Sequence, residues 1–280
     1  MAELMSSLES LFAGAQAGGG TYSYTHIAYP QVLLAAGFVL LAGVLSVVHK
    51  LRLERDLALG AVLAFLQLSV VGYLLTAIFA LHSIWPVLGM YTVTALLATR
   101  LARRKVQTKG VSIALPTFLA MATTCFFLTG LVSGVILKGN PWWEPQYFIP
   151  VGGMIAGNAM NALSIALERF FSELRHRRDE VEAALCLGAS PAEACREMFR
   201  TALRAGMINS VNALMGAGLV ALPGMMTGQI LAGVPPVHAV RYQIVIMLVM
   251  TSSAALSSLA ALLLVRRRCF TQGAALVRFS

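Results

Sequence analysis

Charge is scarce in this sequence: only 12% of its 280 residues are Asp, Glu, Lys or Arg, against about 25% in soluble domains. Apolar residues instead make up 58% of the chain. This composition excludes an ordinary soluble domain, because there is too little charge to cover its surface. It predicts an all-α, polytopic membrane protein.

Several functional signatures are also missing. No Gly-x-x-x-x-Gly-Lys-Ser/Thr motif occurs, so the chain has no P-loop for a nucleotide. The Gly-x-Ser-x-Gly elbow of hydrolases is absent, and no His-Glu-x-x-His site occurs. Four cysteines without a Cys-x-x-Cys pair indicate neither a disulfide framework nor a zinc site. These absences argue against an enzyme and against a cofactor bound by this chain.

Carboxylates are absent from the interiors of the apolar stretches. Glu54, Asp56, Glu144 and Glu168 all lie near their ends. A carrier coupled to protons or sodium ions usually needs an acidic residue inside the membrane. The sequence therefore argues against a secondary transporter.

The apolar residues are gathered into about seven stretches, most of them near the 20 or so residues that cross a bilayer. The third reaches span length only with flanking residues. We expect an extracytoplasmic, flexible lead-in over 1–29, one transmembrane domain over 30–268 and a cytoplasmic tail over 269–280. The predicted spans are 30–48, 57–80, 85–99, 111–137, 150–170, 205–232 and 240–265.

The basic residues predict the topology. All but two of the 21 Lys and Arg residues lie in four segments, the exceptions being Lys138 and Arg241. An excess of Lys and Arg marks the cytoplasmic side. The protein is therefore expected in the cell membrane with its N-terminus outside and its C-terminus in the cytoplasm. The net charge of +9 then concerns orientation and anionic lipid, not nucleic acid. The four basic segments are 49–56, 100–110, 168–204 and the tail from 266.

The longest of these predicted cytoplasmic loops contains a polar segment with signals for the start and end of short helices. Asp179 is expected to cap a short helix, and Gly188 to end it in the left-handed conformation that glycine tolerates best. Ser190, Pro191 and Glu193 match the capping box that starts a second helix. The sequence therefore predicts a helix-turn-helix within residues 179–200.

The first of these helices resembles a known motif. Glu182, Ala183, Ala184 and Gly188 match the Glu-Ala-Ala-x-x-x-Gly coupling loop of ABC-transporter permeases. The distal Leu-Pro of that motif is missing, and Arg200-Thr201 stands near its place. An ordinary amphipathic loop helix would also account for this pattern. Residues 222–244 and 169–180, however, resemble the FetB-like permeases, which include bacterial iron-export permeases and plant aluminium-sensitivity permeases.

That resemblance implies a membrane subunit that works with a separate ABC ATPase. Two copies of the permease would pair with two ATPase subunits, which alone would use ATP and magnesium. The residues implied to contact the ATPase are Glu182, Ala183, Ala184, Gly188 and Ala189. The implied cargo is a metal ion, iron, moved outward. One alternative is a nucleotide sugar such as UDP-glucose or another organic solute; another is a membrane scaffold for stress tolerance that transports nothing.

The sixth predicted span contains the candidate transport path. Proline removes a backbone donor, and a broken helix can line a cavity with free carbonyl groups. Methionine thioethers suit soft metals, whereas iron prefers oxygen donors such as amides and carbonyls. Helix packing and hydrogen bonds between helices remain the alternative explanation. The path residues are Asn158, Asn161, Pro223, Gly224, Met225, Met226 and Gln229, with Met225 and Met226 as candidate metal ligands.

Overall fold

A computed structural model describes residues 29–51, 53–81, 83–104, 106, 113–271 and 276. Within these residues all regular structure is helical, apart from two isolated bridges. The all-α prediction is therefore confirmed. The predicted lead-in lies outside the described residues except for Tyr29, and so does most of the predicted tail.

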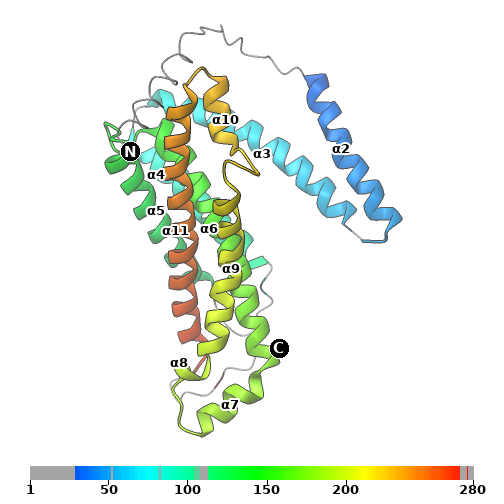
Figure 1. Cartoon of the computed structure of the whole chain (residues 1–280), viewed down its shortest axis with the longest axis vertical. Helices are drawn as coiled ribbons and strands as arrows, with labels where there is room; N and C mark the ends of the chain where they lie inside the picture. Colours follow the sequence, from blue (N-terminus) through cyan, green and yellow to red (C-terminus); the bar gives the residue numbers. More distant parts are fainter. Residues whose placement is uncertain are drawn as a thin grey trace, which may run out of the picture. The chain divides into compact units, whose positions relative to one another are not determined.

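The chain divides into two compact units, Met1–Leu81 with Thr227–Ala239, and His82–Met226 with Val240–Ser280. We call them unit 1 and unit 2. The helices are α2 (Tyr29–Val48), α3 (Glu54–Leu81), α4 (Ile84–Arg104), α5 (Ala114–Leu131), the π-helix η1 (Val132–Ile136), α6 (Pro145–His176), α7 (Arg178–Cys186), α8 (Pro191–Ala194), α9 (Arg196–Gly216), α10 (Gly224–Leu231) and α11 (Pro236–Arg268) (Figure 1).

Five of the described helical stretches are long and apolar enough to cross a membrane: α3, α4, α5 with η1, α6 and α11. α2 adds a shorter apolar stretch over Ala36–Val48. The chain is thus a polytopic membrane protein. The third predicted span, 85–99, lies within a 21-residue helix, so α4 reaches span length through the flanking residues.

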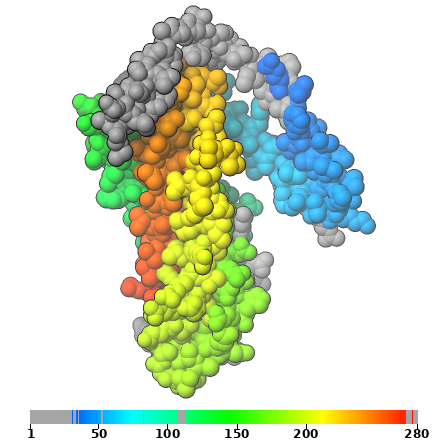
Figure 2. All heavy atoms as spheres, viewed as in Figure 1, coloured from blue at the N-terminus to red at the C-terminus, as the bar shows by residue number. Residues whose placement is uncertain are grey.

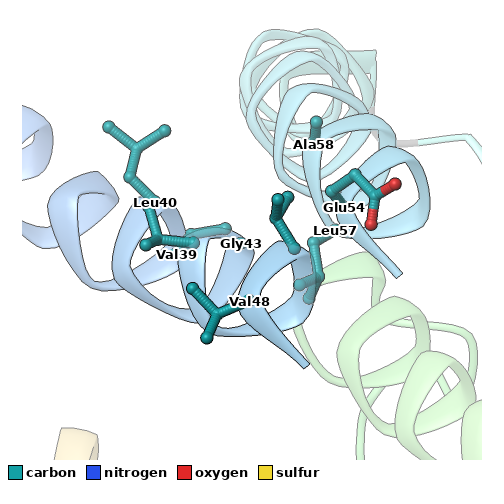
Figure 3. Close-up of a pocket in the computed structure, with 9 residues that line it drawn as sticks. Val39, Leu40, Gly43, Val48, Glu54, Leu57 and Ala58 are labelled. Carbon is teal, nitrogen blue, oxygen red and sulfur yellow. The ribbon is translucent and has the colours of Figure 1, made fainter. Parts of the chain in front are cut away.

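Unit 1 contains a hairpin of α2 and α3 with a well-bonded turn. The buried Ser46 hydroxyl accepts the Leu53 N–H at 2.9 Å and donates to the Glu54 carboxylate at 3.2 Å. Beside the turn, a groove of about 380 Å³ is lined by apolar side chains of both helices together with Glu54 (Figure 3). Such a lining suits hydrocarbon, as expected for membrane helices.

α6 is the central helix of unit 2, and α4, α5 and α9 pack against it. Its buried face alternates small and large apolar residues, so neighbouring helices can approach closely. A Cβ added at Gly206 of α9 would lie 2.6 Å from the carbonyl oxygen of Ala162 and 2.9 Å from Cβ of Ala166. Only glycine fits at that crossing. Figure 2 shows α9 packed beside α11 along the same unit.

The two ends of unit 2 differ in chemistry. Tyr91 of α4 stacks edge-on against Phe148 of α6 at 5.7 Å, and Phe126 of α5 and Trp142 join the same cluster. Since Tyr91 and Phe148 both lie near the start of their helices, α4 and α6 run in the same direction. Their basic C-terminal ends therefore share the other end of the unit. This separation agrees with the predicted topology, whose sidedness stays a prediction.

The sixth predicted span is not one helix. α9 ends at Gly216, the chain runs irregularly over 217–223, and α10 begins at Gly224. Proline at 223 fixes its own backbone and disfavours a helical Leu222. The predicted span over 205–232 therefore contains a broken helix, and the break begins before Pro223, because α9 already stops at Gly216. Gly218 adopts a φ of +87° within the gap.

Candidate functional site

The predicted polar segment forms a helix-turn-helix that links α6 to α9 (Figure 1). α7 follows α6 directly, with Arg177 between them, and α9 follows α8 through Cys195. Asp179 was predicted as the cap of α7, but the structure gives that position to Arg177, whose backbone turns at φ −111°. Asp179 instead lies in the first turn, where its negative charge still favours the helix dipole.

Gly188 ends α7 in a Schellman motif. Its φ is +89°, as predicted for this position. The Gly188 N–H donates to the Leu185 carbonyl and the Ala189 N–H to the Ala184 carbonyl, both at 3.0 Å. These two bonds satisfy carbonyls that a helix end would otherwise leave free. The turn therefore has one defined geometry.

The second helix starts with the predicted capping box. The Ser190 hydroxyl accepts the Glu193 N–H at 3.3 Å, and the Glu193 carboxylate accepts the Ser190 N–H at 2.9 Å. The hydroxyl also donates to that carboxylate at 2.6 Å. These hydrogen bonds from Ser190 hold the pKa of Glu193 below its ordinary value. The carboxylate is thus charged at neutral pH and helps to fix the turn.

The turn between α7 and α8 exposes apolar side chains to solvent, although the segment around it is polar. Leu187, the residue before Gly188, is 88% exposed. Ala183, one turn earlier on the same face, is also exposed, whereas Val181 is buried against unit 2. The sequence motif pointed to the alanines and Gly188 but missed Leu187. Its signal was a large apolar residue directly before a helix-ending glycine.

A groove of about 260 Å³ runs along the inner side of the turn. Ala184 and Ala189 supply its small apolar lining, and acidic residues including Glu180 and Glu193 supply charge. The hydrogen bond from Arg177 to Glu180, at 2.6 Å, holds the pKa of that carboxyl below its ordinary value. Small residues between fixed charges leave room for a side chain of another protein.

Glu182, the first residue of the motif, is bound within its own helix. Its carboxylate accepts a hydrogen bond from Arg178 at 2.7 Å, one turn earlier, and both side chains are partly exposed. An exposed pair with this spacing stabilises a helix by only about 0.3–0.5 kcal/mol. Glu182 therefore supports the helix geometry while it remains accessible at the surface.

The end of α11 braces this segment. The Arg266 guanidinium lies over the Phe199 ring of α9, 5.4 Å from its centroid. Cys195, at the junction of α8 and α9, is buried, and so is Cys269 just after α11. Burial raises the pKa of Cys195 to about 11 and that of Cys269 to about 12. Both thiols are neutral and packed.

The structure places Asn158, a predicted path residue, in a bridge between three helices. Its amide nitrogen donates to the Met250 carbonyl at 2.7 Å and to the Ser210 hydroxyl at 3.1 Å. Ser210 in turn donates to the Asn158 amide oxygen at 3.3 Å. These bonds connect α6 to α9 and α11. They match the alternative explanation from the sequence, in which such amides form hydrogen bonds between helices. Asn161 is exposed on α6 instead.

The remaining path residues lie at or after the break. Pro223 directly precedes α10 and Gly224 is its first residue, and Met226 is buried while Met225 is half-buried. Neighbouring positions on a helix point about 100° apart, so these two thioethers do not face one ion from α10 alone. Gln229 follows on the same helix but belongs to unit 1. The described residues contain no cluster of three His, Cys, Asp or Glu side chains that could hold a metal.

The fold and this segment define the class: a multi-pass, all-α membrane protein with a capped helix-turn-helix at one end of its larger unit. The chain belongs to the Uncharacterised protein family (UPF0014), whose model matches residues 29–270. Together with the relatives below, this confirms the predicted resemblance to the FetB-like family.

Several relatives cover most of this chain. The UPF0014 membrane protein slr1647 of Synechocystis is 40% identical over 207 residues, which is 74% of this chain and 80% of that protein. The probable iron export permease protein FetB of Escherichia coli is 32% identical over 246 residues, or 88% and 93% of the two chains. The protein ALUMINUM SENSITIVE 3 of Arabidopsis thaliana is 34% identical over 223 residues, or 79% and 80%. No solved structure matches the chain.

Proposed function

We propose that this chain is the membrane permease subunit of an ABC transporter, and that the helix-turn-helix over α7 and α8 docks on a separate ATPase subunit. One observation carries this proposal: a rigidly capped turn presents the exposed Leu187 and Ala183 at a polar end of the molecule. An apolar side chain exposed to this degree on a fixed turn suits a contact with another protein. The similarity to a relative named as a permease supports the same assignment.

The connections of this segment suit it to transmit motion. α7 continues from α6 after a single residue, and α8 continues into α9 in the same way. α6 and α9 are in turn locked together at Gly206 and through Asn158. A displacement of the turn by an ATPase would therefore move both helices as a pair. ATP and magnesium would be bound by the ATPase, since this chain has no P-loop.

The assembly we propose contains two copies of this chain and two ATPase subunits in the cell membrane. The turn and the C-terminal end would face the cytoplasm, and the N-terminus the outside. The distribution of Lys and Arg supports this orientation. An ATPase on the cytoplasmic side requires it, because ATP is there.

A pair of substitutions at Gly188 tests the docking role. Leucine disfavours φ near +90°, whereas asparagine tolerates the left-handed conformation and serves as the matched control. The permease would be reconstituted with a candidate ABC ATPase subunit identified by copurification with it. We expect Gly188→Leu to abolish stimulation of ATP hydrolysis and Gly188→Asn to keep most of it. Full stimulation in the leucine variant would refute the coupling role.

The cargo we propose is iron, moved outward. FetB is named a probable iron export permease, and it matches this chain over 93% of its own length. Amide and carbonyl groups near the α9–α10 break could supply the oxygen donors that iron prefers. ATP hydrolysis by the reconstituted pair would be measured with Fe²⁺, Fe³⁺, other metal ions and UDP-glucose. Stimulation by UDP-glucose alone would replace the metal by an organic cargo. Stimulation by none of them would refute the iron assignment without refuting the permease assignment.

A further inference from the structure

A second groove in unit 2 lies between α4 and α5, at the end where α4 finishes. It has a volume of about 750 Å³, which is the size of a small-molecule site. Its lining changes in character along its length. Leu96, Leu97, Leu115 and Phe118 are apolar, while Arg100, Arg103 and Arg104 lie within the last turn and a half of α4.

The three arginines have no acidic partner among the described residues. Neither α4 nor α5 contains an Asp or Glu, and the ion pairs of the described chain involve other arginines, Arg169, Arg177, Arg178 and Arg200. Nε of Arg103 is buried and donates to no acceptor among the described residues. A buried guanidinium nitrogen without an acceptor is costly, which indicates that an anion completes the site.

The apolar part of the groove is open to its surroundings. Leu96, Leu97 and Leu115 are between 51% and 56% exposed on the two helices that flank the groove. α4 and α5 are both apolar enough to cross the membrane, and within a bilayer these exposed side chains would face hydrocarbon. The arginines at the helix end then lie at the level of the phosphate groups.

We propose that this groove binds an anionic phospholipid. Arg100 and Arg103 would hold its phosphate through paired N–H groups, the geometry in which guanidinium matches phosphate. An acyl chain would lie along Leu97, Leu115 and Phe118. Basic pockets between helices on the cytoplasmic side are suited to such headgroups. A free phosphate would leave the apolar half of the groove unfilled, which favours the lipid.

The test uses the full chain purified in detergent and titrated with phosphatidylglycerol, phosphatidylcholine or inorganic phosphate, with bound lipid counted by native mass spectrometry. Each arginine near an anionic lipid contributes about 1 kcal/mol, so Arg100→Gln with Arg103→Gln should weaken phosphatidylglycerol binding about 30-fold. Arg267→Gln with Arg268→Gln is the matched control, because it removes two exposed charges from the last turn of another apolar helix, α11. We expect that control to change binding less than twofold.

Each other outcome would overturn the proposal. Equal loss in both double variants would mean general attraction to a basic surface. Competition by millimolar inorganic phosphate would mean an anion site without a lipid chain. Phosphatidylcholine bound as tightly as phosphatidylglycerol would remove the role of headgroup charge. Arg100 is exposed, so the single variant Arg100→Gln should fold normally and should still weaken phosphatidylglycerol binding severalfold.

Discussion

The helices after α6 are interrupted at the α7–α8 turn and at the α9–α10 break, and these two interruptions are built differently. At the α7–α8 turn, Gly188 has a φ of +89°, a Schellman motif closes one helix, and a capping box opens the next. At the α9–α10 break, Gly218 has a φ of +87°, and backbone hydrogen bonds such as that from the Gly218 N–H to the Ala221 carbonyl, at 3.0 Å, close a turn. The chain nevertheless stays non-helical for seven residues, 217–223, before α10 starts. Similar glycine geometry thus occurs in a short turn between two capped helices in one case and in a longer non-helical connection in the other.

We infer from this difference that the two interruptions have different roles. A turn that transmits force needs rigid helix ends. Caps provide this rigidity, because they pair the backbone N–H and C=O groups that the ends of a helix leave unpaired. A non-helical stretch inside a predicted span takes some carbonyls out of the helical hydrogen-bond pattern, where they could bind an ion. On our proposal, the first interruption meets the ATPase and the second meets the cargo.

The largest loss of stability is expected at the contact between α6 and α9, because α9 lies between the two interruptions. Gly206→Ala would place a Cβ 2.6 Å from the Ala162 carbonyl oxygen, so α6 and α9 would have to separate. Overpacking of this kind costs about 1–3 kcal/mol. Thermal unfolding in detergent should show a clear loss of stability. Gly157→Ala on α6 is the control, because a Cβ there meets nothing within 4 Å. An unchanged Gly206→Ala variant would show that the two helices are not locked.

A second pair compares the two glycines directly. Gly188→Ala and Gly218→Ala both place a Cβ in open space, so each should lose only the cost of left-handed backbone, about 1–2 kcal/mol. Their stabilities should therefore fall alike in thermal unfolding. Only Gly188→Ala should reduce stimulation of the ATPase when no cargo is present. Equal loss of stimulation in both variants would remove the distinction between the two sites.

A smaller effect is expected at the capping box. Ser190→Ala removes the acceptor of the Glu193 N–H and should cost about 1 kcal/mol. Thr201→Ala, at an exposed position inside α9, should change stability by less than about 0.5 kcal/mol. Both values can be read from unfolding in detergent. A Ser190→Ala variant as stable as Thr201→Ala would mean that the turn does not need its cap.

The last prediction concerns only the accessibility of the cysteine thiols to a labelling reagent. Cys186, at the end of α7, is exposed, whereas Cys125, Cys195 and Cys269 are buried. Burial raises the pKa of Cys195 to about 11, so its thiol stays protonated and unreactive at pH 8. A maleimide at pH 8 should label the native protein once and Cys186→Ser not at all. Rapid labelling of Cys195 would show that the α8–α9 junction opens.

The sequence predicts the α7–α8 turn well because its determinants are local. Gly188, Ser190, Pro191 and Glu193 act on residues within one helical turn, so their spacing alone indicates the caps. The N-terminal boundary of α7 was less predictable, since α6 runs on to His176 and leaves only Arg177 between the helices. Asp179 looked like a cap when that continuation was not known.

Non-local features could not be predicted in the same way. The partners of Asn158 lie 52 and 92 residues away in sequence, so only the packed helices show that its amide bridges α9 and α11. The exposure of Leu187 is equally a result of the fold, because an apolar residue in a loop helix normally faces the protein. The groove between α4 and α5 could not be predicted, because it forms only where the two helices pack together. The sequence showed its arginines only as part of the basic segment 100–110.

The central claim is that the turn at Gly188 contacts an ATPase, and photo-cross-linking tests it most directly. A photoreactive amino acid would replace Leu187 in the permease expressed with the candidate ABC ATPase subunit. Arg204, exposed on α9, would be replaced as the control. Illumination should join the ATPase to the permease from position 187 and not from position 204. A permease that forms no cross-link from position 187, while it still copurifies with the ATPase, would contradict the account.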